Sequence, residues 1–338
     1  MGKRIAAFGE VMMRLQVPGY ELLAQASRLN YSFSGTGVNV AAALSRLGHV
    51  GYLVSTLPDS PLGDAAASYL RKLGIDTSFL SMGGKYVGMY FLENGFGARP
   101  SRVTYTNRLE SSFNTAPESA YPFADIAKQI DAAHFCGITL AMNDTVRCHM
   151  KAFAREVKAS GGTVIFDCNY RPSLWGEDGY ALAKPHYADM LSLADIVMMN
   201  EQDALYTLGM KSDKTTRREQ LQELIPQVAQ QFGIRAIAGT HRSVNGDNTH
   251  GLQGFLYKAG QFHFSKELRF SVYDRIGAGD AFTSGIMHGE LERLSPEETV
   301  EFAAAAGMLA HTIVGDTPMS TEPEIRRAIT VSAADVER

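Results

Sequence analysis

Short apolar runs recur along the chain and alternate with segments whose apolar residues have helical spacing. Runs at residues 5–8, 134–137 and 163–166 have the length of buried strands, whereas 281–287 has the spacing of a helix. Strands that alternate with helices in this way are typical of a parallel sheet covered on both sides. The pattern predicts an α/β fold with a central, mostly parallel sheet and helices on both faces.

A hairpin is predicted in the early part of the chain. Residues 87–91 and 101–108 have the composition of strands, and the segment between them contains Asn94-Gly95, a dipeptide typical of tight turns. Together with an earlier segment, this hairpin is predicted to form a small β lid built from about 12–34 and 85–112.

The sequence between these elements contains no segment that would separate two domains. A length of 338 residues suggests about two domains, but no Pro- or Ser-rich linker and no charge run divides the chain. We therefore predict one large α/β domain at residues 1–330, which carries the lid, and a C-terminal tail at 331–338.

A glycine-rich turn at residues 274–282 follows a strand-like segment at 268–273 and opens a helix. Gly277 and Gly279 let the backbone approach an anion, and the start of a helix favours negative charge. Asp280 adds a carboxylate at the same place. An anion site beside a proton acceptor is what phosphoryl transfer requires, so we predict Asp280 as the general base. The alternative is a tight turn in which Asp280 only caps the helix.

Two segments resemble the signatures of the ribokinase-like (PfkB) carbohydrate kinases. Residues 274–282 resemble the C-terminal signature, and residues 34–48 resemble the substrate loop and its following helix. The resemblance implies a ribokinase-like fold and an ATP-dependent carbohydrate kinase. The catalytic residues that it implies are Asp280, Gly277, Ala278 and Gly279, and the substrate loop that it implies comprises Gly35, Thr36, Gly37, Val38 and Asn39.

Residues 166–175 are similar to a segment of the 2-keto-3-deoxygluconate kinases and their near relatives, including fructokinases. The resemblance implies that Arg171 within it faces either the acidic end of the substrate or the nucleotide phosphates, and a planar guanidinium is the side chain that best binds a carboxylate. The alternative is an ordinary surface arginine, and Trp175 is predicted to be a core residue. The resemblance implies an ATP-dependent kinase acting on the terminal hydroxyl of 2-keto-3-deoxygluconate, with fructose or another sugar as the alternative. It also implies substrate contacts from Tyr90, Tyr105 and Arg108 of the hairpin and from the loop residue Asp316.

On the nucleotide side, the chain departs from the family pattern. Asn200 and Asp203 match a family Asn-x-x-Glu motif that places magnesium through water, with Asp203 in place of Glu. Asp203 keeps the charge but has a shorter reach. Without the resemblance, Asn200 is equally well explained as a helix cap followed by acidic residues of the first turn.

A second departure follows the strand at 234–238, where the Lys-x-Gly turn of the family is absent. Thr240 and Arg242 are the candidates to replace its phosphate contacts. The resemblance implies that the small-residue helix at 301–311 flanks the adenine, whereas its alanines at 303–306 are themselves expected to serve tight packing. The resemblance implies ATP and Mg²⁺ as cofactors and leaves open a monovalent cation bound through Asp274. The predicted nucleotide contacts are Asn200, Thr240, Arg242, Gly277 and Gly279.

Composition narrows the class of partner. A formal net charge of −4 provides no basic field for nucleic acid or anionic membrane, and no apolar run approaches the ~20 residues of a membrane span. Three cysteines without paired spacing argue against a disulfide framework or a structural zinc site. We predict a cytoplasmic enzyme whose partners are a sugar acid and ATP, without nucleic acid or membrane. The resemblance implies a homodimer.

Two other classes of function compete with the kinase. In a dinucleotide enzyme, Gly35 and Gly37 would open a phosphate-binding helix and Asp59 would bind a ribose, but Val40 occupies a position that requires Gly or Ala. A catalytically silent sugar-acid sensor would keep the fold and lose the base. Asp280 and its glycine turn are intact, which favours the kinase.

Overall fold

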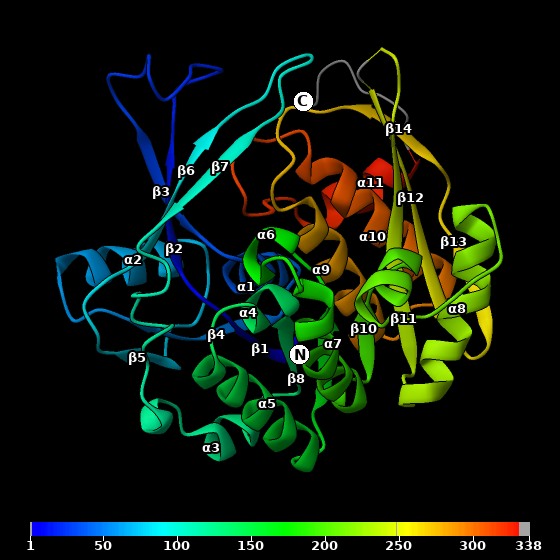
Figure 1. Ribbon diagram of the computed structural model, residues 1–338, viewed down its shortest axis with the longest axis horizontal. Coiled ribbons are helices and arrows are strands. Elements are labelled where there is room, and N and C mark those ends of the chain that lie inside the picture. The colour runs from blue at the N-terminus through cyan, green and yellow to red at the C-terminus, as the bar shows by residue number, and fades with distance from the viewer. Residues whose placement is uncertain (1, 248, 331–338) are drawn as a thin grey trace.

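The computed structural model describes residues 2–247 and 249–330. Its central sheet has the strand order β13-β12-β11-β10-β9-β8-β1-β4-β5, and β14 pairs with β12 (Figure 1). The neighbouring strands in the stretch β11-β10-β9-β8-β1-β4-β5 of this order are parallel, whereas β12 pairs antiparallel with β11, β13 and β14. The predicted mostly parallel sheet is confirmed. Its strands are β1 (Arg4–Phe8), β4 (Val50–Leu57), β5 (Leu80–Met82), β8 (Ala132–Cys136), β9 (Thr163–Asp167), β10 (Ile196–Met198), β11 (Ala236–Val244), β12 (Thr249–Lys258), β13 (Gln261–Phe264) and β14 (Leu268–Ser271).

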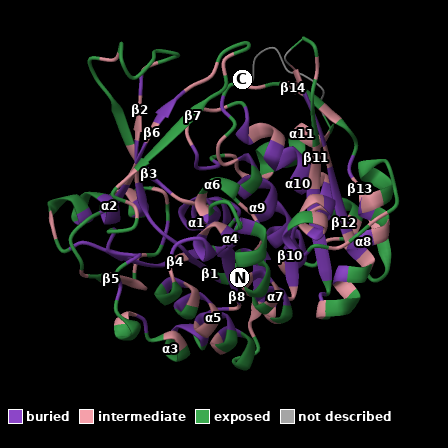
Figure 2. Cartoon of the chain, viewed as in Figure 1, coloured by how far each residue is buried: buried purple, intermediate pink, exposed green. Residues whose placement is uncertain are grey.

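Helices cover both faces of this sheet, as predicted. Ala6 and Phe8 of β1 pack into the core beneath α5 and α7, whereas Ile5 packs on the opposite face beneath α1, α9 and α10. Figure 2 shows that the buried residues gather in the interior, around the strands of the main sheet, and that the exposed residues lie around the outside. The helices are α1 (Thr36–Arg46), α2 (Pro61–Lys72), α3 (Phe123–Ala127), α4 (Gly137–Leu140), α5 (Asp144–Ala159), α6 (Pro172–Trp175), α7 (Gly179–Leu193), α8 (Arg217–Phe232), α9 (Ala278–Leu291), α10 (Pro296–Ala310) and α11 (Glu322–Thr330), with short turns η1 (Glu118–Ala120) and η2 (Asp203–Thr207).

Local signals set where several elements begin and end. Helix α10 begins before the predicted 301–311 because Ser295 and Glu298 form a reciprocal capping box with Pro296 at the first position. Strand β14 ends at Ser271 and not at the predicted 273. The amide of Tyr273 instead donates a hydrogen bond of 2.8 Å to the carbonyl of His311, just after α10. This bond directs the chain into the glycine turn.

A smaller four-stranded sheet extends from the main body, at the upper left of Figure 1. Its order is β3-β2-β6-β7, and the predicted hairpin is confirmed as the antiparallel pair β6 and β7. Its strands are β2 (Met12–Gln16), β3 (Asn30–Ser34), β6 (Gly88–Glu93) and β7 (Arg102–Thr106). The predicted tail at 331–338 lies outside the described residues. None of the described helices is both long and apolar enough to span a membrane.

Candidate active site

Two adjoining cavities lie where strands β9 and β10 end and helix α9 begins, beside the middle of strand β11. Their volumes are about 470 and 500 Å³, and Asn169, Arg171, Arg242 and Gly279 line both. The carboxyl ends of parallel strands are the usual place for a ligand in an open α/β sheet. Among the predicted residues, the first cavity is lined by Gly35, Thr36, Asn39, Tyr90, Tyr105, Arg108, Gly277, Asp280 and Asp316, and the second by Asn200, Asp203, Thr240 and Ala278. Gly37 and Val38 are buried in α1, behind the first cavity.

Asp280 lies in the first turn of α9 and is buried. Its Oδ2 accepts a hydrogen bond of 2.7 Å from the Asn39 side-chain Nδ2, and the Thr317 hydroxyl donates to the Asn39 side-chain Oδ1 at 3.3 Å. Burial raises the pKa of Asp280 to about 7, against the opposing effects of the Asn39 hydrogen bond and the Arg171 charge. A carboxylate with this pKa accepts a proton near neutral pH. The predicted Asn39 thus contacts the predicted base directly.

The two glycines of the turn have different roles. Gly277 has φ 85°, and a Cβ at this position would overlap the carbonyl oxygen of Asp316. A Cβ on Gly279, by contrast, would meet no protein atom within 4 Å, and this residue faces both cavities. Gly277 is therefore required for the shape of the turn, whereas Gly279 leaves space for a ligand.

The small sheet contributes the opposite wall of the first cavity. The Tyr90 hydroxyl lies 2.9 Å from the Ser34 hydroxyl and donates to Asp316, and Tyr105 pairs with Tyr90 across the hairpin. Burial raises the pKa of Tyr90 to about 12, so its hydroxyl remains a donor. The Arg108 guanidinium lies 4.9 Å from the centre of the Tyr105 ring. The structure therefore brings the predicted hairpin residues to one surface.

Sequence reasoning missed Glu10, which partners Arg108. The Arg108 Nε donates to Glu10 Oε2 at 2.8 Å, and Ser111 donates to Oε1 at 2.8 Å. Burial raises the pKa of Glu10, while the Arg108 charge and these hydrogen bonds oppose the shift. The available signal was a carboxylate two residues after the buried strand β1. This pair holds Arg108 in place but also balances part of its charge.

Three other arginines border the cavities without a carboxylate partner. Arg171 and Arg242 line both cavities, and Arg275, which sequence reasoning missed, lines the first. Within residues 2–247 and 249–330, none of these three forms an ion pair; Arg171 donates only to the carbonyl of Tyr170, at 3.2 Å. Burial lowers the pKa of Arg242, and the positive charge of Arg275 adds to this shift. Unpaired guanidinium groups facing a cavity are suited to anionic ligands.

Two carboxylates face the second cavity. Burial raises the pKa of Asp167 to about 8 and that of Asp203 to about 6, and neighbouring carboxylates add to both shifts. Asp203 Oδ2 accepts a hydrogen bond from the backbone N–H of Asn200 at 2.9 Å, and Asn200 Oδ1 accepts one from the backbone N–H of Gln202 at 2.8 Å. Asn200 and Asp203 thus cap the turn after β10, which is the local alternative stated above, and also line the cavity.

The segment that replaces the Lys-x-Gly turn lies at the middle of β11. Thr240 faces the second cavity, while the His241 ring is 2.8 Å from the buried carboxylate of Glu201. Arg217 donates to the other oxygen of Glu201 at 2.5 Å. Although burial acts to raise it, the pKa of Glu201 is lowered by its hydrogen bonds to His241 and Arg217. This Glu201 network fixes the edge of the cavity on which Thr240 and Arg242 lie.

Comparison with known proteins places the chain in a family. The model of the pfkB family of carbohydrate kinases matches residues 3–323, and the chain belongs to this family. It is therefore an ATP-dependent carbohydrate kinase, and its fold is ribokinase-like. A 2-dehydro-3-deoxygalactonokinase of Haloferax volcanii is 28% identical to it over 338 residues, which is 100% of both chains.

Solved structures extend the comparison. A protein from Enterococcus faecalis, named provisionally as a 2-keto-3-deoxygluconate kinase, is 36% identical with a TM-score of 0.95, over 100% of this chain and 99% of its own. The 2-dehydro-3-deoxygluconokinase of Thermotoga maritima is 31% identical with a TM-score of 0.93, over 98% and 99%. The chain is thus similar over its whole length to kinases named for keto-deoxy sugar acids.

Proposed function

We propose that this enzyme transfers the γ-phosphoryl group of ATP to the terminal hydroxyl of 2-keto-3-deoxygluconate. One observation carries the proposal: arginines without carboxylate partners border a cavity whose wall contains the buried carboxylate of Asp280. A neutral sugar does not need such charges, whereas a sugar acid has one carboxylate to bind. The names of the three relatives above support the same class of substrate.

The acceptor occupies the first cavity in this proposal. Arg171 and Arg108 bind its carboxylate, Tyr105 packs against it, and the loop from Gly35 to Asn39 holds its hydroxyl groups. Tyr90 and Asp316 are bonded to each other at the same wall, so we assign them to orienting the sugar end. We assign the small sheet the role of a lid, because Tyr90 of β6 and Val103 and Tyr105 of β7 line this cavity together with the first turn of α9.

The proton and the phosphoryl group then have defined partners. Asp280 accepts the proton of the terminal hydroxyl, and Asn39 keeps the carboxylate aimed at it through the 2.7 Å hydrogen bond. The backbone amides at 277–279, at the positive end of α9, bind the phosphoryl group while it passes from ATP to the sugar hydroxyl. Proton transfer to a group with a pKa of about 7 is matched to neutral pH.

ATP occupies the second cavity in this proposal, with phosphate contacts from Thr240, Arg242 and Asn200. Magnesium is usually held by one or two carboxylates together with phosphates and water, and the Asp167 and Asp203 side chains in one cavity fit that pattern. When bound, the ion neutralises charge on the phosphate oxygens. Asp203 would hold it through water, since one of its oxygens already accepts from the Asn200 amide.

The experiment that tests this function is a substrate panel. We expect ATP turnover with 2-keto-3-deoxygluconate and its galactonate epimer to exceed that with fructose, ribose or adenosine by more than ~10-fold. Arg171→Ala should raise KM for the acid ~10–100-fold, because a charge-assisted hydrogen bond is worth about 1.5–3 kcal/mol. Turnover of fructose alone would contradict the sugar-acid assignment, and no turnover of any sugar would favour the silent sensor.

Oligomeric state is a separate proposal. We infer a cytoplasmic homodimer formed through the small sheet, in which Tyr31 of β3, Phe96 of the β6–β7 loop and Leu109 just after β7 are exposed. Its edge strand β7 is also almost fully exposed (Figure 2). Exposed edges and apolar patches of this kind mark interaction surfaces. Light scattering should give twice the mass of one chain, and Phe96→Asp should reduce it; a monomeric mass for the unaltered protein would refute the dimer.

A further inference from the structure

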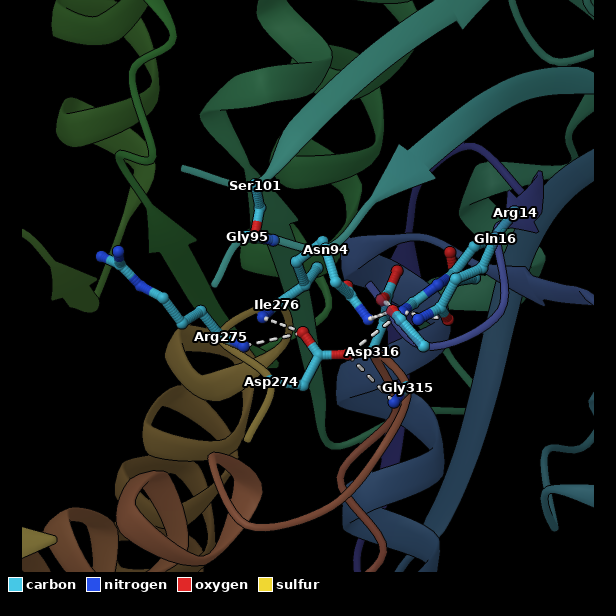
Figure 3. Close-up of polar contacts among 12 residues, drawn as sticks. Arg14, Gln16, Asn94, Gly95, Ser101, Asp274, Arg275, Ile276, Gly315 and Asp316 are labelled. Atoms are coloured by element: carbon cyan, nitrogen blue, oxygen red, sulfur yellow. Dashed lines mark hydrogen bonds and ion pairs between the residues drawn. The ribbon is translucent and has the colours of Figure 1, made fainter. Parts of the chain in front are cut away.

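A fully buried arginine connects the small sheet to the catalytic turn. Arg14 lies on β2, yet its guanidinium lies between two carboxylates from the C-terminal part of the chain (Figure 3). Its Nη2 donates to Asp274 Oδ2 at 3.1 Å, and its Nη1 forms an ion pair with Asp316. Only 1% of the Arg14 side chain is exposed. Neither cavity includes Arg14 in its lining, so this residue does not reach a ligand.

The Asp274 carboxylate is fully occupied by donors. Its Oδ1 accepts from the amides of Arg275 and Ile276, at 2.7 and 3.2 Å. Its Oδ2 accepts from Arg14 and from the Gly315 amide, the latter at 3.3 Å. These four donors use the four lone-pair positions that a carboxylate offers.

Each oxygen of the Asp316 carboxylate also has a partner. Arg14 pairs with one of its oxygens, and the Tyr90 hydroxyl donates to the other. A monovalent cation at Asp274 needs oxygen atoms with free lone pairs and would lie beside a fixed positive charge. The residues present therefore do not fit the monovalent cation that the sequence left open.

We propose that Arg14 provides, as a fixed side chain, the positive charge at Asp274, so that the enzyme works without a monovalent cation. Arg14 is a positioning residue: it holds the 274–279 turn against the 315–317 loop. Gly277, three residues after Asp274, packs directly on the carbonyl of Asp316. The inference rests on the proposed function only in assigning the 277–279 turn to phosphate binding.

Loss of the guanidinium would leave two buried carboxylates facing each other. Their repulsion would move the turn away from the loop and displace the amides that receive the phosphoryl group. Arg171 and Arg108, proposed to bind the sugar carboxylate, and Thr240 and Asn200, proposed to bind ATP, lie on other elements and would remain in place. The effect should therefore fall on kcat more than on either KM.

The first test needs no variant. With whichever sugar is turned over most rapidly, we expect equal rates, within about 2-fold, in potassium, sodium and tetramethylammonium buffers of matched ionic strength. The melting temperature should likewise be the same in the three buffers. A rate in potassium that is ~10-fold higher than in tetramethylammonium, or a melting temperature raised by potassium alone, would overturn the proposal. A lack of turnover with every sugar would count against the proposed function, while the melting comparison would still decide the cation question.

The second test removes the charge. Arg14→Met keeps the length of the side chain, and we expect its kcat to fall at least ~10-fold, with partial recovery on adding guanidinium ion. Arg155→Met, on the exposed face of α5, is the matched control and should keep the kcat of the unaltered enzyme with and without guanidinium. If Arg14→Met does not fold, Arg14→Lys retains the charge, and we expect it to keep more activity than any neutral variant. An Arg14→Met enzyme with unchanged kcat would overturn the proposal.

Discussion

Asp280→Asn is expected to reduce kcat by ~10²–10⁴-fold, the usual contribution of a positioned general base, and to leave sugar binding largely intact. The asparagine preserves the shape of the side chain but has no basic oxygen for the hydroxyl proton. Steady-state rates give kcat, and calorimetric titration with the sugar gives the dissociation constant. A variant with unchanged turnover would mean that another group takes the proton.

The pH profile provides the control for this assignment. Since the raised pKa of about 7 leaves Asp280 protonated below neutrality, kcat/KM should increase with pH and level off above about pH 7. Asn39→Ala removes the hydrogen bond that favours the carboxylate, so its profile should move to higher pH. A shift to lower pH, or none, would contradict the role given to Asn39.

The substitutions Gly277→Ala and Gly279→Ala are both expected to lower kcat, for different physical reasons. Gly277→Ala forces an L-residue into a left-handed conformation and against the Asp316 carbonyl, so the turn must move and kcat should fall by at least ~10²-fold. Gly279→Ala meets no protein atom, so its methyl group enters the space for the phosphoryl group and lowers kcat without disturbing the fold.

Thermal unfolding separates the two mechanisms. Gly279 lies within a helix, where alanine is more favourable by about 0.5–1 kcal/mol, so Gly279→Ala should unfold at the same or a higher temperature. Gly277→Ala should unfold at a lower temperature. A destabilised Gly279→Ala variant would show that this position supports the fold and does not simply leave room for the ligand.

The main sheet could be predicted because its signals are local. Apolar runs such as 5–8 are buried on both faces, and adjacent residues of β1 enter different cores. The hairpin could likewise be predicted, because the dipeptide Asn94-Gly95 is a local turn signal. Bounds were less predictable: β14 ends early because the amide of Tyr273 bonds to His311, a partner far along the chain.

In the candidate site too, the residues that belong to a local motif could be predicted, whereas those that depend on distant partners could not. Asp280 and its two glycines belong to one short motif, so sequence alone located them. Glu10 and Arg14 were missed, because their importance depends on partners that only the folded chain brings near. Arg14 in particular is an ordinary arginine in a strand until the fold encloses it between two carboxylates.

The long sequence separation of the contacts around the base has a consequence for biosynthesis. Asn39 and Asp280 are 241 positions apart, and Arg14 and Asp274 are 260 apart. Strands β1, β4, β8, β9 and β10 are all translated before residue 274, so a nascent chain can assemble most of its sheet while Arg14 still lacks both of its carboxylate partners. Until residues 274–317 have left the ribosome, this growing chain has neither the proposed base nor the proposed phosphate site. We therefore expect catalytic competence to be acquired only late in synthesis.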